Sequence, residues 1–275
     1  MSRATVSAVF STKNVGGFVG PTLDSLAFCD EVIVVDMFST DNTREVCESY
    51  PNVRFFQRND FIYGNFNHGV EQSTGDWIIR IDSDEVLSPE LQKSILDVLN
   101  DPNPQFTNYE AIMHLYKFGM RVKGLDGNKW RTTLYRKGTA YYKVQIEHED
   151  LTVTGPTGRL AGQYDHFSVP TISSSVAKYN YYTDQDTLRI PIRKPKNRWK
   201  VLIDAARYFR YAYFGKGRLR HDGYLGFTVA LLATYNQILY DLKSWEIYER
   251  DQRAKQGTLS THPNMAHPRD KIATR

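Results

Sequence analysis

The sequence predicts an α/β protein: a doubly wound, mainly parallel sheet followed by a smaller C-terminal helical region. Strand-like and helix-like segments alternate over roughly the first hundred residues, and from about Thr171 the apolar pattern becomes purely helical. The 275 residues, 41% of them hydrophobic, suffice for one substantial core and a smaller second unit. We therefore expect a first domain at 1–170, a helical region at 171–255 and a flexible tail at 256–275.

Four segments read as parallel strands. Thr5–Phe10 alternates and is rich in β-branched residues, whereas Glu31–Val35 is a continuous apolar run typical of a strand buried on both faces. Val53–Gln57 and Trp77–Ile81 are the third and fourth strands. Three later segments resemble antiparallel strands that extend or cover the sheet, namely 111–116, 132–136 and 141–146.

Helical segments separate these strands. The first four are expected at 19–28, from the N-cap candidates of 39–43 through Tyr50, at 66–73 and at 89–100. Three more follow at 173–188, 196–214 and 223–253, with Pro191 and Pro195 separating the first two of them. The alternation makes the sheet mainly parallel, because parallel neighbours need crossover connections.

Composition excludes several classes of protein. The two cysteines, Cys29 and Cys47, form no CxxC pair, so neither a disulfide framework nor a structural zinc site is indicated. The N-terminal segment has one basic residue and too short an apolar run for a secretory signal, so we expect a cytoplasmic protein.

The formal charge of +4 is unevenly distributed along the chain. Residues 189–220 hold eleven Lys and Arg and a single acid, Asp204, which leaves 24 basic and 30 acidic residues elsewhere. A basic segment on an otherwise acidic chain predicts an anionic partner: membrane headgroups, nucleic acid or a phosphate-bearing acceptor.

Acidic residues follow two of the predicted parallel strands. Asp36 and Asp82 stand directly after them, and ligands of such sheets bind beyond the carboxyl ends of the strands. In Asp82-Ser83-Asp84-Glu85, two carboxylates one residue apart can hold Mg²⁺ or Mn²⁺, and such a cation would neutralise a diphosphate leaving group. The alternative is that these acids are solvated or cap the next helix.

Two segments carry a resemblance to a known family. Val34-Val35-Asp36-Met37-Phe38-Ser39-Thr40-Asp41-Asn42-Thr43 is similar to "vvDxxStDxT", and Thr74-Gly75-Asp76-Trp77-Ile78-Ile79-Arg80-Ile81-Asp82-Ser83-Asp84-Glu85 to "geWilxlDaDE", both of the inverting family-2 glycosyltransferases. The resemblance implies a GT-A fold, with the nucleotide-sugar-binding catalytic domain at 1–170. It further implies that Asp36 contacts the nucleoside, that Asp82 lies near the ribose or donor sugar, and that Asp84 coordinates the metal.

The resemblance continues beyond these two segments, roughly from Thr5 to Glu249. Glu147-His148-Glu149-Asp150 is similar to the "vHE" element of the branch that includes lipopolysaccharide-core glucosyltransferases, and Asp165-His166-Phe167 to its "lxHy". Lys178–Thr183 and Asp222–Gly226 continue the similarity. The chain departs from the family where Asn14-Val15 stands for "NE" and where Arg220-His221-Asp222-Gly223 stands for "fldG".

This resemblance also implies a mechanism. Direct displacement at the anomeric carbon needs a base to take the acceptor proton and a metal to stabilise the departing phosphate. Glu149 is the expected base, with Asp150 and His148 as alternatives; a surface Glu-Asp pair is the other interpretation. His166 would complete the metal shell through a ring nitrogen; the alternative is that it is a structural histidine. The implied ligands are Mn²⁺ or Mg²⁺, a nucleotide-sugar donor, foremost a UDP-sugar, and a glycan or lipid-linked acceptor.

Four further residues are candidates for contacts to the donor. Arg131 and Arg136 bracket 132–135, and guanidinium groups pair well with diphosphate oxygens; as an alternative they are surface strand residues. Thr12 and Asn14 come just after the first strand and are expected to border the nucleotide.

The basic segment contains an amphipathic pattern. Lys196, Lys200, Arg207 and Arg210 lie largely off a helical stripe of apolar residues, which consists of Trp199, Leu202, Ile203, Ala206, Phe209 and Tyr213. This predicts peripheral attachment to an anionic membrane at its inner face; the alternative is that the stripe packs on the catalytic domain. Gly223–Tyr240 has no charged residue, but its polar residues favour a buried or interfacial helix over a span of about 20 residues.

Other functions fit less well. Asp82–Leu87 matches the DxDx[TV]L motif of haloacid-dehalogenase-like phosphatases, whose first Asp is a nucleophile, but that motif normally follows the first strand. A nucleotidyltransferase would need a glycine-rich, lysine-containing first loop. A non-catalytic membrane or nucleic-acid adaptor built on 189–220 would have no evident use for Asp36, Asp82 and Asp84 together. We therefore expect glycosyl transfer and no nucleic-acid partner.

Overall fold

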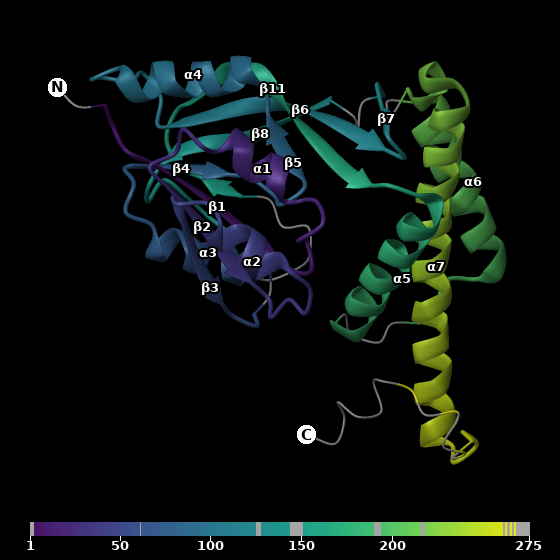
Figure 1. Cartoon of the computed structure of the whole chain (residues 1–275). Coiled ribbons are helices and arrows are strands. Elements are labelled where there is room, and N and C mark those ends of the chain that lie inside the picture. Colours follow the sequence, from purple (N-terminus) through teal and green to yellow (C-terminus); the bar gives the residue numbers. More distant parts are fainter. Residues whose placement is uncertain are drawn as a thin grey trace. The chain divides into compact units, whose positions relative to one another are not determined.

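The computed structural model describes residues 3–60, 62–124, 128–143, 151–189, 194–215 and 218–260, together with 262, 265 and 267. The chain forms two compact units, Met1–Ser168 and Val169–Arg275. The first unit is built around a sheet and the second consists of helices (Figure 1).

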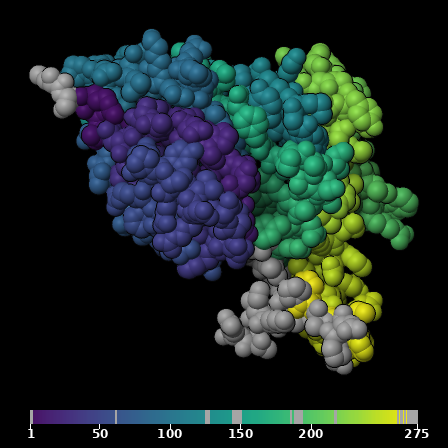
Figure 2. Space-filling view, in the orientation of Figure 1, coloured from purple at the N-terminus to yellow at the C-terminus, as the bar shows by residue number. Residues whose placement is uncertain are grey.

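The first unit contains a nine-stranded sheet in the order β3-β2-β1-β4-β8-β6-β11-β5, with β7 paired to β6. Its first half is parallel and consists of β3 (Val53–Gln57), β2 (Glu31–Asp36), β1 (Val6–Thr12) and β4 (Trp77–Arg80). All six residues of β2 are buried, as its continuous apolar run predicts. In space-filling form the purple and blue residues of this half make one continuous mass (Figure 2).

Beyond β4 the sheet is antiparallel, so it is a mixed sheet. β8 (Asn128–Arg136) pairs with β4, and β6 (Asn108–Lys117) pairs with β8 and with β7 (Met120–Arg121). The long β11 (Thr157–Val169) and the short β5 (Glu85–Leu87) complete the sheet and are antiparallel to each other. A separate two-stranded sheet joins β9 (Ala140–Tyr141) to β10 (Thr152–Val153).

Helices cover both faces of the parallel half, which confirms the doubly wound arrangement. Successive residues of β2 point to opposite faces. Val32 and Val34 join a core with Leu23 of α1 (Gly20–Ser25), Cys47 of α2 (Thr43–Glu48) and Leu91 of α4 (Pro89–Asn100). Ile33 and Val35 join a second core with Phe66 of α3 (Ile62–Gln72).

The start of α4 holds β11 in place. Ser88 caps the helix, because its Oγ accepts a hydrogen bond from the backbone nitrogen of Leu91 (3.2 Å), and Pro89 follows it. The Ser88 backbone nitrogen donates to the Gln163 carbonyl oxygen (2.9 Å), and the Gln163 nitrogen donates to Ser88 Oγ (3.2 Å). Gly162 has φ +82°, and a Cβ there would lie 2.4 Å from the Leu91 nitrogen. The close approach brings β11 alongside β5.

The second unit contains α5 (Ile172–Arg189), α6 (Arg198–Phe214), a 3₁₀ turn η2 (Leu219–Asp222) and α7 (Gly223–Lys255). Within it α7 lies between α5 and α6 and packs against both (Figure 1). Lys243 of α7 donates to Asn180 Oδ1 (2.8 Å) and Thr183 Oγ1 (2.9 Å) of α5. None of the helices among the described residues is long and apolar enough to cross a membrane.

Candidate active site

Asp36 and Thr12 end two neighbouring parallel strands and are paired in register. Both are buried, and Asp36 is 0% exposed. Asp36 accepts hydrogen bonds from the backbone nitrogen (2.9 Å) and hydroxyl of Ser39 and from Gln57 Nε2 (3.2 Å). Thr12 Oγ1 is buried and has no hydrogen-bond partner within the described part of the chain. Since buried polar atoms normally have partners, this hydroxyl suits a site that a ligand or water completes.

The loops after β1 and β2 are tied together beside Asp36. Asn14, whose φ is 54°, donates its backbone nitrogen to Ser39 Oγ (2.7 Å) and accepts from the Thr40 backbone nitrogen at Oδ1 (2.8 Å). The Val15 nitrogen donates to Thr43 Oγ1 (2.8 Å) in the same way. The "StDxT" part of the motif therefore has a local role, because its hydroxyls hold the two loops at the carboxyl edge of the sheet.

The segment from Asp82 to Glu85 makes a tight turn between β4 and β5. Hydrogen bonds between Glu85 and Asp82 hold this turn together. The Glu85 nitrogen donates to the Asp82 carbonyl oxygen (3.0 Å), and the Asp82 nitrogen donates to Glu85 Oε2 (2.9 Å). Glu85 Oε1 accepts from Arg131 Nη1 (2.7 Å). Glu85 is 1% exposed, and burial raises its pKa; the charge of Asp82 adds to this, while Arg80 and His166 act in the opposite direction.

Two guanidinium groups hold the Asp82 carboxylate. Arg80 Nη2 lies 3.1 Å from both carboxylate oxygens of Asp82, and Arg131 Nη2 lies 3.3 Å from Oδ2. Arg80 Nε donates to the Tyr142 hydroxyl (2.9 Å). The sequence patterns singled out Arg131 but neither Arg80 nor Tyr142. The signal for Arg80 was a lone charge within the apolar strand Trp77–Ile81.

Asp84 lies next to His166 because β5 pairs with β11. His166 is opposite Glu85 in the register, and the Phe167 nitrogen donates to the Asp84 carbonyl oxygen (2.9 Å). His166 Nε2 is 3.3 Å from Asp84 Oδ2, and Nδ1 is 3.8 Å from Glu85 Oε1. Burial lowers the pKa of His166, but the hydrogen bond and charge of Asp84, with the charges of Glu85 and Asp82, outweigh it and raise the pKa overall.

The donor atoms of Asp84 and His166 fit a divalent cation, since carboxylate oxygen and imidazole nitrogen both ligate such ions. Among the described residues, no three His, Cys, Asp or Glu side chains come together as a possible metal site. Of the expected ligands Asp84, Asp82 and His166, the structure brings Asp84 and His166 together, while the carboxylate of Asp82 is bound by two arginines.

The other expected site residues are placed as follows. Arg136 is opposite Trp77 at the start of β4 and lies over its ring at 5.1 Å, so it is at the end of the strand away from Asp82. The structure therefore does not bring Arg136 to this edge, because β8 runs antiparallel to β4 and carries its last residues away. His148, Glu149 and Asp150 lie outside the described residues, and their roles stay predictions.

One family model matches this chain, and several known proteins are similar to it. Residues 7–154 match the family model described as glycosyl transferase family 2. The chain is 26% identical over 274 residues to the lipopolysaccharide core biosynthesis glycosyltransferase LpsC of Rhizobium meliloti (strain 1021), covering 96% of this chain and 97% of that protein. An uncharacterized glycosyltransferase of Rickettsia felis (strain ATCC VR-1525 / URRWXCal2) is 24% identical over 247 residues, covering 85% and 87%. The crystal structure of S. aureus TarS 1-349 in complex with UDP is 16% identical with a TM-score of 0.47, covering 92% of each chain.

The family match spans both acidic segments on which the resemblance was based, and it extends over more than half of the chain. The mixed sheet with acidic residues at the carboxyl edge of its parallel half, followed by helices, is the GT-A arrangement that the resemblance implied. The chain is therefore a glycosyltransferase and belongs to glycosyl transferase family 2.

Proposed function

We propose that this glycosyltransferase moves a sugar from a nucleotide-sugar, foremost a UDP-sugar, to a glycan or lipid-linked acceptor, with inversion at the anomeric carbon. We assign it to the synthesis of cell-surface polysaccharide or lipopolysaccharide, which the similarity to LpsC over nearly the whole chain supports. The observation that carries the proposal is the Asp84–His166 pair beside the arginine-bound Asp82, at one edge of the sheet.

The nucleoside would bind at the ends of β1 and β2. Asp36 is held in one orientation by Ser39 and Gln57, which suits a carboxylate that must meet a ligand in a fixed geometry. The Thr12 hydroxyl lies at the neighbouring strand end, and Asn14 belongs to the loop that follows it. We place Asp82 near the ribose or donor sugar, because two guanidinium groups fix its carboxylate on the next strand.

A divalent cation, Mn²⁺ or Mg²⁺, would be held by Asp84 and His166. When bound, such an ion stabilises the negative charge that develops on a departing diphosphate. Of the two arginines expected near the diphosphate, only Arg131 is bonded to Asp82, so we keep that role for Arg131. Glu149 remains our choice of base for the acceptor hydroxyl, with Asp150 and His148 as alternatives.

The donor and metal assignments are tested together by calorimetric titration of UDP, GDP and dTDP, in Mn²⁺ and in EDTA. We expect one nucleotide to bind, and to bind much more tightly in Mn²⁺ than in EDTA. Asp84→Ala should weaken this binding about tenfold or more, because a metal ligand is removed. Asp97→Ala is the matched control: this exposed carboxylate of α4 pairs with Lys93 (3.5 Å), and its loss should leave binding unchanged.

Two outcomes would contradict the proposal. Equal nucleotide binding in Mn²⁺ and EDTA would exclude the metal site, and binding of none of the three nucleotides would exclude the donor class. A phosphatase reaction at Asp82 is not an attractive substitute, because Asp82 follows the fourth strand and its carboxylate is occupied by Arg80 and Arg131.

We also propose that the enzyme works at the inner face of a cell membrane. A lipid-linked acceptor would lie there, and the basic segment 189–220 has the charge that an anionic membrane surface attracts.

A further inference from the structure

Helix α6 exposes its large side chains and buries its small ones. Ala205 and Ala212 are its buried residues, whereas Trp199 is 63% exposed, Ile203 50% and Phe214 55%. A helix that packs only within a protein normally buries its largest apolar side chains, since removing their surface from water is favourable. Apolar side chains gathered on an exposed face mark a surface that binds something.

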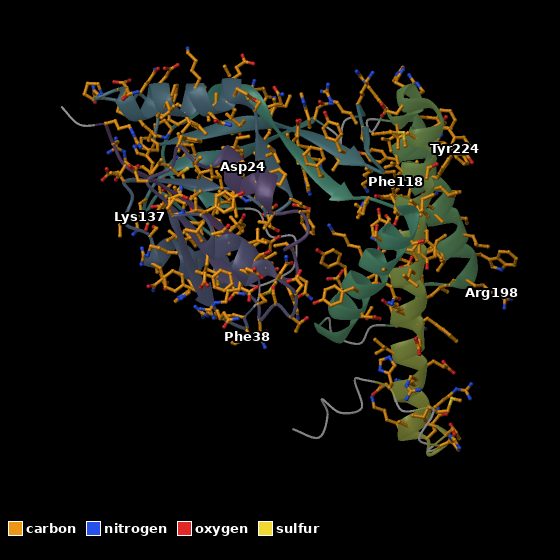
Figure 3. All side chains as sticks on the ribbon, in the orientation of Figure 1. Asp24, Phe38, Phe118, Lys137, Arg198 and Tyr224 are labelled. Atoms are coloured by element: carbon orange, nitrogen blue, oxygen red, sulfur yellow. The ribbon has the colours of Figure 1, made fainter. Side chains whose placement is uncertain are left out.

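The apolar stripe expected from the sequence is divided in the structure. Phe209 and Tyr213 stack on each other and meet Phe227 of α7 edge to face, so they belong to the contact between α6 and α7. The remaining residues of the stripe are exposed, namely Trp199, Leu202, Ile203 and Ala206. At the start of the helix, beside the Arg198 label, side chains project away from α7 (Figure 3).

Cations stand among these exposed apolar side chains. Arg207 follows Ile203 by four residues, and Arg210 precedes Phe214 by four, so the four side chains share one face of the helix. Both arginines are exposed. The single acid of the helix, Asp204, is shared by three cations: Lys196 and Lys200 lie 3.4 Å from it, and Arg207 lies 3.8 Å from it. The face is therefore positive as well as apolar.

We infer that this surface, the α6 face (Trp199, Ile203, Arg207, Arg210 and Phe214), binds flat against the headgroup layer of an anionic phospholipid membrane. Tryptophan and arginine suit that layer, the first because its ring is apolar with a polar edge, the second because its guanidinium pairs with phosphate. The 17 residues of α6 are about 25 Å long and would lie in the plane of the surface.

Other occupants of the α6 face fit less well. A second copy of the chain would bring the same arginines against these, and like charges repel. A nucleic acid would meet the arginines but would gain little from Ile203 and Phe214. A shallow, open groove of about 380 Å³ lies beside the face; it is lined by Lys196, Asp204, Arg207, Tyr208, Tyr211 and Gln237, and within it Lys196 is paired with Asp204 (3.4 Å).

The inference deepens the proposed function, since a lipid-linked acceptor would give the α6 face its purpose, but the test does not need catalysis. The full chain is sedimented with phosphatidylglycerol vesicles and with phosphatidylcholine vesicles. We expect binding to the first and little to the second. Arg207→Glu with Arg210→Glu should weaken binding more than tenfold, because each cation near an anionic surface contributes about fivefold. Trp199→Ala with Ile203→Ala should also weaken it about tenfold.

The matched control reverses the same number of charges in the first unit. Arg44 and Lys93 are exposed helix residues there, and Arg44→Glu with Lys93→Glu should bind vesicles as the native chain does. Equal loss in this control, no loss in either α6 variant, or native binding that ignores lipid charge would each overturn the inference. So would binding to duplex DNA in place of vesicles.

The same proteins are titrated with UDP in Mn²⁺. If the native chain binds the anionic vesicles but not UDP, the proposed function fails and the inference about the α6 face stands. If it binds UDP but not the vesicles, the proposed function stands and the inference fails.

Discussion

Among single residues, Glu85 joins three parts of the site that the sequence suggested separately. Its carboxylate accepts from the Asp82 nitrogen and from Arg131, and it lies 3.8 Å from His166 Nδ1. A carboxylate so deeply buried is stable only with such partners. Glu85 is therefore a positioning residue: it fixes the turn that carries Asp82 and Asp84 and the arginine that holds Asp82.

We predict that Glu85→Gln weakens Mn²⁺-dependent UDP binding about tenfold to a hundredfold, because partners behind a metal ligand tune its affinity on that scale. Binding in EDTA, where Asp84 and His166 hold no ion, should change much less. Calorimetry compares the loss of UDP affinity in Mn²⁺ with the loss in EDTA. A larger loss in Mn²⁺ indicates a positioning role, because a general loss of structure would weaken binding in both conditions. Glu90→Gln, an exposed acid in the first turn of α4, is the control. Equal loss in Mn²⁺ and EDTA would contradict the assignment.

Glu31 is a second buried carboxylate, and its role is structural. It accepts from Ser7 Oγ (2.7 Å), Arg54 Nη1 (2.7 Å) and Thr74 Oγ1 (2.9 Å), so it ties β1, β3 and the start of β4 to β2. Burial alone would raise its pKa, but the hydrogen bonds from Thr74, Ser7 and Arg54 outweigh this and lower the pKa from 4.5 to about 2.

A pH dependence of folding follows from this shift. Because the folded pKa lies below the unfolded one, Glu31 stabilises the protein above pH 4.5, and the contribution is lost as the pH falls through about 2. Between about pH 5 and pH 3 the native protein should lose about 2 kcal/mol of unfolding free energy that Glu31→Gln does not lose. Urea unfolding at both pH values measures this. Glu48→Gln, an exposed acid of α2, should behave like the native protein.

At the scale of elements, the turn from β5 into α4 and its contact with β11 determine where His166 lies. Ser88 serves both elements, since its Oγ accepts from Leu91 in α4 and from Gln163 in β11. The neighbouring pairing of β5 with β11 then sets His166 opposite Glu85. The cap of one helix is thus part of the support of the candidate metal site.

Ser88→Ala should lower the unfolding free energy by about 1 kcal/mol, because the backbone nitrogens of Leu91 and Gln163 both lose the hydroxyl that accepts their hydrogen bonds. Asn42→Ala is the matched comparison: Asn42 occupies the N-cap of α2 but makes no side-chain capping bond, so its replacement should cost clearly less. Thermal or urea unfolding measures the loss of unfolding free energy in each variant. A loss for Asn42→Ala as large as that for Ser88→Ala would show that the cap geometry is not the cause.

Over the whole molecule, the two proposed activities fall in two units of different character. The described residues of the two cores in the first unit all belong to that unit, and the expected donor site is at one edge of its sheet. The second unit contains the basic segment that the sequence singled out, and α6 carries two of its arginines, Arg207 and Arg210, on an exposed face. Sugar transfer and membrane attachment are therefore assigned to different parts of the chain, and variants can test them separately.

Features that depend on neighbouring residues could be predicted from the sequence alone. Hydrophobic periodicity located β1 to β4 and the helices between them, and the position of Asp36 and Asp82 after strands placed both at the carboxyl edge of a parallel sheet. The order of acidic motifs was enough to indicate the family. These signals are local, because periodicity of 2 or about 3.6 residues shows directly in a short segment.

Which distant residues meet could not be predicted from the sequence. The strand β11 was not expected, since Thr157–Val169 mixes glycines and polar residues without a clear alternation, yet it brings His166 to Asp84. The arginine pair around Asp82 and the distance of Arg136 from it follow from β8 running antiparallel to β4. Strand order and register arise from long-range packing, and a one-residue change in register would turn each of these side chains to the other face.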